Sequence, residues 1–139
     1  MSKEISPPTL ADIDSLARAA LDVLPPELKE FTEGVIVQVE EFPDDEVCAE
    51  MGLESPFDIL GLYQGVSLAE KRIESSGATP DMVFLYRRPI LDYWCETGAD
   101  LGHVVRHVLI HEIGHHFGFS DEEMETLEVI AEAQDSSAG

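Results

Sequence analysis

Residues 99–117 constrain the fold of this chain more than any other segment. At about 100° per residue, their apolar side chains cover nearly the whole circumference of a helix. His111 and His115 stand four residues apart within this segment, and Glu112 directly follows the first of them. Such a helix is expected to be central and buried, where an unpaired polar group costs about 1–3 kcal/mol. The imidazoles and the carboxylate therefore need partners.

The spacing H-E-x-x-H suggests a metal ion as that partner. Side chains four residues apart share one helix face, with Cβ atoms about 5–6 Å apart, so both imidazoles can bind one ion. Glu112 falls about 100° round the helix from His111, where its carboxylate can reach a metal-bound water without binding the metal. This pattern is typical of zinc hydrolases. We therefore predict Zn²⁺ as cofactor, His111 and His115 as ligands and Glu112 as catalytic base.

A third ligand is expected after the helix. Gly118 can adopt the left-handed conformation that ends a helix, and Asp121 follows three residues later. The whole string, H-E-x-x-H-x-x-G-x-x-D, resembles the metzincin pattern with aspartate in place of its third histidine. Asp121 is the predicted third ligand. A gluzincin-like alternative uses Glu125 or Glu128 from the following helix, most of whose glutamates are expected to face solvent.

The remaining histidines allow a rival interpretation. His103 and His107 continue the four-residue ladder towards the N-terminus and could form a pair of their own, but no glutamate follows either one. His107 lies about 9 Å along the axis from the midpoint of the 111/115 pair, too far to complete that site. Both are expected to be surface or hydrogen-bonded residues. His116 points about 100° away from His115 and is expected to pack or to orient a neighbour.

Composition limits the partners. The chain of 139 residues has 8 basic and 29 acidic residues, giving a net charge of −21. This charge argues against nucleic acid and anionic lipid and favours cationic peptides or metal ions. The simpler alternative is a solvated acidic surface that implies no partner. No stretch is long and apolar enough to span a membrane, no leader is recognisable, and Cys48 and Cys95 lack C-x-x-C spacing. These features predict a cytoplasmic monomer with free thiols.

The chain should form one domain over residues 9–133, with a loose leader at 1–8 and a disordered tail at 134–139. Thr9 with Asp12, and Ser120 with Glu123, predict capped helix starts. The expected elements are helices after Thr9, at 26–33, at 44–51, at 99–117 and from 120 to about 133, strands at 35–39, 58–63 and 82–87, and an exposed connection over 65–80.

The strand at 82–87 suggests how a substrate could bind. An edge strand can pair with an extended peptide through main-chain hydrogen bonds, and this strand is expected to be such an edge or its neighbour. The alternative is an ordinary core strand, with Arg87 and Arg88 paired to acidic neighbours.

Three segments carry a resemblance to a known family: LGLYQGVSL at 60–68, VFLYRRPI at 83–90 and HEIGHHFGFSD at 111–121. With them the chain resembles the small bacterial zincin-like metallopeptidases, which have a minimal zincin fold. The resemblance implies an α+β fold, with a small mixed sheet packed on several helices around a central active-site helix. It also implies a metal at His111, His115 and Asp121, with Glu112 as base. The resemblance does not supply a substrate; from the predicted zinc chemistry we expect a peptide or protein. Two further classes stay open: a metal-binding regulatory or interaction module without hydrolysis, and an acidic protein-binding domain.

Overall fold

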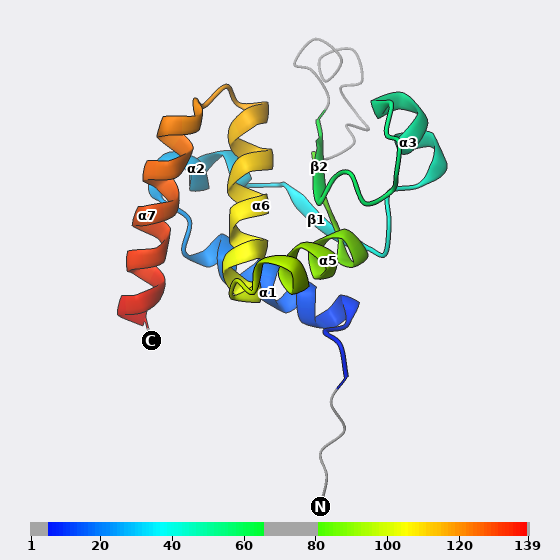
Figure 1. Cartoon of the computed structure of the whole chain (residues 1–139). Helices are drawn as coiled ribbons and strands as arrows, with labels where there is room; N and C mark the ends of the chain where they lie inside the picture. Colours follow the sequence, from blue (N-terminus) through cyan, green and yellow to red (C-terminus); the bar gives the residue numbers. More distant parts are fainter. Residues whose placement is uncertain (1–5, 66–80, 139) are drawn as a thin grey trace, which may run out of the picture.

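A computed structural model describes residues 6–65 and 81–138, with side chains to residue 133 (Figure 1). Nearly all of the expected connection at 65–80 lies outside the described residues. The same holds for residues 1–5 of the expected leader and for Gly139 of the expected tail.

The described strands form one mixed sheet. Its order is β1 (Ile36–Glu40), β3 (Met82–Tyr86) and β2 (Gly61–Gln64), with β1 parallel and β2 antiparallel to β3. Strand β3 is therefore the central strand and the neighbour of the edge. Its inner residues Val83 and Leu85 are fully buried, as expected of a core strand.

The first of the two arginines after β3 pairs with an acidic residue, as the core-strand interpretation predicts, whereas the second contacts an aromatic ring. Arg87 forms an ion pair of 2.8 Å with Glu41 and donates to the carbonyl of Pro8. The guanidinium of Arg88 lies 5.6 Å from the ring centroid of Phe42, a distance typical of a cation–π contact.

Helices make up the rest of the described fold. They are α1 (Leu10–Asp22), α2 (Pro26–Lys29) with the 3₁₀ turn η1 (Glu30–Thr32), α3 (Asp45–Met51), α5 (Arg87–Thr97), α6 (Leu101–His116) and α7 (Asp121–Ala138). Both expected capping boxes are present, Thr9 with Asp12 and Ser120 with Glu123. Each satisfies backbone N–H groups that have no partner in the first turn of a helix. None of the described helices is long and apolar enough to cross a membrane.

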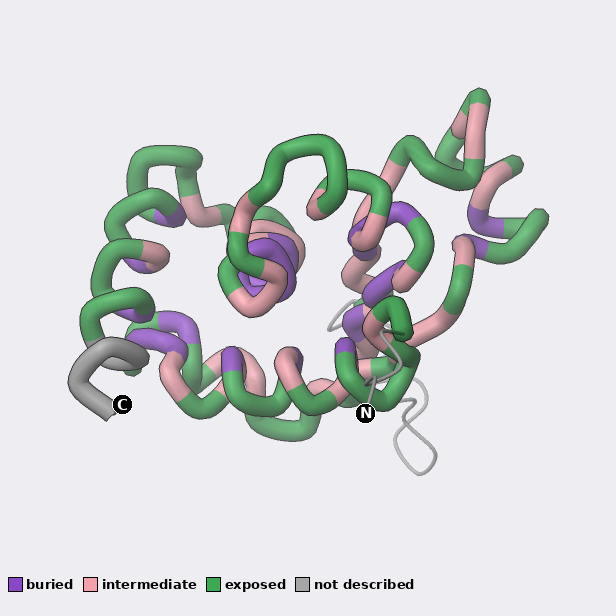
Figure 2. The backbone as a smooth tube through the Cα atoms, turned by 60° about the horizontal axis from the view of Figure 1, so that its bottom comes forward, coloured by how far each residue is buried: buried purple, intermediate pink, exposed green. Residues whose placement is uncertain are grey.

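Helix α6 lies at the centre of the fold, as its sequence predicts. It contacts α1, α2, α5, α7, β2 and β3, and Figure 1 shows it between α7 on one side and the sheet on the other. Val105, Leu109, Ile110 and Ile113 are fully buried. In Figure 2 the buried positions gather in the interior and the exposed ones line the outside. The α+β class with a central buried helix is thus confirmed.

Two helical segments extend beyond the sequence prediction. Residues 88–97 carry no predicted element but lie in α5, because Pro89 stands in the first turn, where the missing N–H has no helical partner to lose. Gly98, with φ of 69°, ends that helix. Helix α7 continues past Ala133 to Ala138, since no glycine or proline interrupts its sequence.

Candidate metal centre

Helix α6 carries a ladder of imidazoles at four-residue intervals. The ring centroids of His107 and His111 lie 4.1 Å apart, and those of His111 and His115 lie 5.6 Å apart with the rings nearly perpendicular. His103 begins the ladder and lies 3.4 Å from the guanidinium of Arg106. The ring of His111 thus has close ring neighbours on both sides, His107 and His115.

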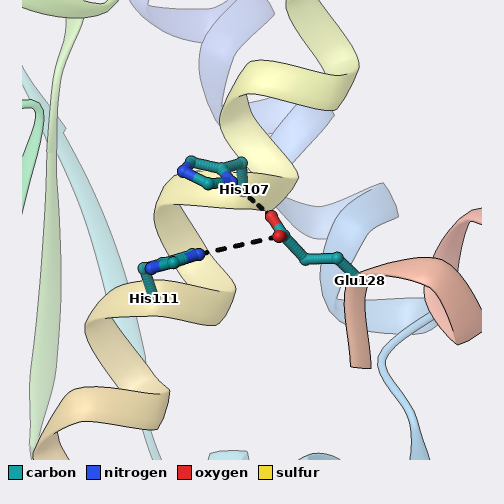
Figure 3. Close-up of side chains that lie close together, drawn as sticks. All are labelled: His107, His111 and Glu128. Atoms are coloured by element: carbon teal, nitrogen blue, oxygen red, sulfur yellow. Dashed lines mark hydrogen bonds and ion pairs between the residues drawn. The ribbon is translucent and has the colours of Figure 1, made fainter. Parts of the chain in front are cut away.

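Glu128 on α7 joins two members of this ladder (Figure 3). Its Oε1 is hydrogen-bonded to Nδ1 of His107, and its Oε2 lies 3.6 Å from Nε2 of His111. One ligand atom from each of these three residues lies within 4.8 Å of the other two, which makes them the metal-ligand group in the described part of the chain. The group combines one predicted ligand, one member of the rival histidine pair and the glutamate of the gluzincin-like alternative.

Close packing of α7 on α6 presents Glu128 to the imidazoles. A Cβ added at Gly114 of α6 would lie 2.5 Å from Sδ of Met124, so the two helices approach through a glycine. Met124, Leu127 and Ala131 are buried on the inner stripe of α7, and Glu128 belongs to the same stripe. Its side chain is 16 % exposed. A glutamate at an apolar i, i+3, i+4, i+7 position is the sequence signal that could have identified this residue.

The predicted ligands His115 and Asp121 also lie close together. Gly118 has φ of 82° and reverses the chain after α6, so that Oδ1 of Asp121 lies 3.5 Å from Nε2 of His115. These two side chains are 57 % and 87 % exposed. Within the described residues, His111 does not come within the same 4.8 Å spacing of both. The structure therefore brings the predicted ligands together in part, as His115 with Asp121.

His111 is the side chain that most needs a cation. Its Nε2 is buried and has no hydrogen-bond partner among the described residues. Burial, followed by the charge of His107, lowers the pKa of His111, while Glu128 acts in the opposite direction. The neutral imidazole is the form that binds metals. The donor chemistry and this unsatisfied nitrogen both fit a divalent ion such as Zn²⁺.

Glu112 has a raised pKa, and burial is its main cause. A hydrogen bond from the Tyr63 backbone and the charge of His115 partly oppose this shift. A carboxyl group whose pKa is moved towards neutrality can accept and return a proton near physiological pH. The Glu112 carboxyl is therefore easier to protonate than that of an exposed glutamate.

A cavity of about 300 Å³ lies between α6 and the chain that leads into β2. His107, His111, Glu112 and His115 line it on the helix side, and residues 58–61 line it on the other. A Cβ added at Gly61 would lie 2.7 Å from Cγ1 of Val108 and 2.9 Å from the carbonyl oxygen of Phe84. The main chain at residue 61 therefore meets the helix directly.

His116 fixes the far end of β2. Its ring stacks on Tyr63 at 3.9 Å between centroids, and the Tyr63 hydroxyl donates to Oδ2 of Asp81 over 2.7 Å. Burial, with the hydrogen bond and charge of Asp81, raises the pKa of Tyr63 and keeps it protonated. His116 thus packs against the sheet, as the sequence predicts.

Comparison with known proteins identifies the family of this chain. The chain is similar over 78 % of its length to 94 % of a conserved hypothetical protein from Thermo thermophilus, with 22 % identity and a TM-score of 0.49. Among curated proteins, no sequence matches the chain significantly. The sequence model of the zincin-like metallopeptidases matches residues 32–131, which include the sheet, α6 and Glu128. The chain therefore belongs to the zincin-like metallopeptidase family.

Proposed function

We propose that this protein is a zinc-dependent peptidase or amide hydrolase, with His111, His115 and Asp121 as zinc ligands and Glu112 as general base. The observation that carries the proposal is the cavity of about 300 Å³ that His111, Glu112 and His115 line together. Membership of the zincin-like metallopeptidase family supports it.

Zinc and Glu112 would each supply a different part of the proposed reaction. Zinc, when bound, supplies a Lewis acid for the scissile carbonyl and lowers the pKa of water to about 7. Glu112 accepts a proton from the attacking water and delivers it to the leaving amine, so the net reaction adds water across the amide bond. The raised pKa of Glu112 suits the first step, because the conjugate base of a weaker acid takes up a proton more readily.

Strand β2 offers a binding mode for an extended peptide. Among the described strands it pairs with β3 alone, and the chain leading into it lines the cavity. A substrate strand added beside it would place its backbone along α6. The net charge of −21 favours cationic peptides over acidic ones.

Digestion of a broad peptide library tests the proposal. We expect cleavage by the zinc-loaded protein, loss of cleavage with a chelator, and recovery when zinc is added back. Glu112→Gln is the matched control, because it preserves size and should retain zinc while slowing hydrolysis by about 10²–10⁴. Wild-type turnover in this variant would exclude Glu112 as the base. Zinc binding without cleavage of any peptide would favour the metal-binding module instead.

A further inference from the structure

We propose that His107, His111 and Glu128 form a second position for a divalent cation of the zinc class, which competes with the hydrolytic position for the imidazole of His111. The competition rests on the proposed function, whereas the second position stands on its own geometry.

The geometry of the second position is already close to that of a ligand set. Its three donor atoms lie within 4.8 Å of one another, and Glu128 places one oxygen toward each imidazole (Figure 3). Two imidazole nitrogens and a carboxylate oxygen are a set that zinc accepts. The site is thus assembled from two helices whose packing is fixed at Gly114 and Met124.

Burial favours this position over the exposed pair at the end of α6. The side chains of His111 and Glu128 are 23 % and 16 % exposed, whereas that of Asp121 is 87 % exposed. A carboxylate removed from water needs a compensating positive charge, and both contacts of Glu128 in the described residues are to imidazoles, which are charged only when protonated. A divalent cation would satisfy Glu128 together with Nε2 of His111, which lies 3.6 Å from the carboxylate and has no hydrogen-bond partner among the described residues.

The two positions exclude each other because they share His111. A neutral imidazole has one nitrogen with a free lone pair and therefore binds one cation. His107 and His115 are eight residues apart, about 12 Å along the helix axis, so no single ion can contact both. An ion held by His107 and Glu128 leaves His115 and Asp121 without their metal, and this removes the ion from the proposed reaction.

Zinc affinity of metal-free protein, measured by competition with a chromophoric chelator, tests the second position. We expect one ion per wild-type chain, and one ion per chain in both Asp121→Ala and Glu128→Gln. The double variant should bind zinc at least about 10²-fold more weakly than either single variant. Glu125→Gln, an exposed change on the same helix, is the control and should alter nothing.

A second pair of variants distinguishes loss of a zinc ligand from a general folding defect. His107→Gln in the Asp121→Ala background should produce the same loss of affinity, and His103→Gln, one turn earlier on the exposed surface, should not. The second position is refuted if the Asp121→Ala protein binds zinc equally well with and without the added Glu128→Gln or His107→Gln substitution. Two ions per wild-type chain would refute the competition.

Hydrolysis at limiting zinc separates this inference from the proposed function. Glu128→Gln should be faster than wild type when zinc is below one equivalent, because more of the ion reaches His115 and Asp121. Equal or slower turnover overturns the competition. If no variant hydrolyses any peptide, the proposed function fails, and the zinc affinities still decide the second position.

Discussion

Glu112 is the residue in which folding and the proposed catalysis make opposing demands. Its carboxyl accepts a hydrogen bond from the backbone of Tyr63 in β2, and burial raises its pKa. Burial makes the group a better proton carrier, but it also makes the ionised form less favourable in the folded chain. The folded protein should therefore be more stable with the Glu112 carboxyl protonated than with it ionised.

Glu112→Gln should therefore have a pH-dependent effect on the metal-free protein. Because the folded pKa exceeds the unfolded value of 4.5, the folded state binds more protons between the two, and stability falls as pH rises through this window. The variant lacks this loss. Its free energy of unfolding should exceed that of wild type by more at about pH 7 than at about pH 4. Urea unfolding with a chelator present measures the free energy of unfolding of each protein at each pH. A difference between variant and wild type that is the same at about pH 7 and about pH 4 would contradict the prediction.

Among the elements, α6 and α7 approach each other closely beside the site, where Gly114 faces Met124. Gly114→Ala should raise helix propensity by about 1 kcal/mol but overpack the buried Met124, which costs about 1–3 kcal/mol. The overpacking is larger, so the single variant should be less stable than wild type.

The same change should become stabilising when space is made for it. In a Met124→Ala background, a Cβ at position 114 keeps only the ordinary van der Waals contact of 3.7 Å with Cβ of Phe119, so Gly114→Ala should add up to about 1 kcal/mol. Thermal unfolding of the four proteins in this cycle tests the reversal of sign. If Gly114→Ala has the same effect in both backgrounds, Met124 is not what requires a glycine at position 114.

The elements also show what the sequence alone can predict. Helices with local signals were predicted well, because the capping pairs Thr9 with Asp12 and Ser120 with Glu123 act within one turn. The expected histidine spacing on α6 is a local property as well. By contrast, the approach of Glu128 to His107 depends on how α7 packs across α6 through Gly114. No local pattern contains that packing, although the place of Glu128 in the apolar stripe indicates that it faces inwards.

At the scale of the whole molecule, metal binding should couple to folding. An ion that binds the folded chain stabilises it by about 2.7 kcal/mol at a concentration of 100 Kd, on the order of 10 °C in Tm for a domain of this size. We expect zinc to raise the melting temperature, a chelator to reverse the rise, and metal analysis to give one ion per chain. If the melting temperature is the same at every zinc concentration, the folded protein has no zinc site.

Gly61 determines which parts of the cavity can be redesigned. Any side chain at this position would collide with Val108 and with the carbonyl of Phe84, so the wall at residue 61 is bare main chain. A protein engineer who wished to change which molecules fit could therefore not do so by substitution there. On the same wall, Asp58 accepts hydrogen bonds from the backbone N–H groups of Glu54 and Ser55, and Leu60 packs against the hydrophobic core. Ile59 is therefore the position where a substitution should change the shape of the cavity while the strand stays against the helix.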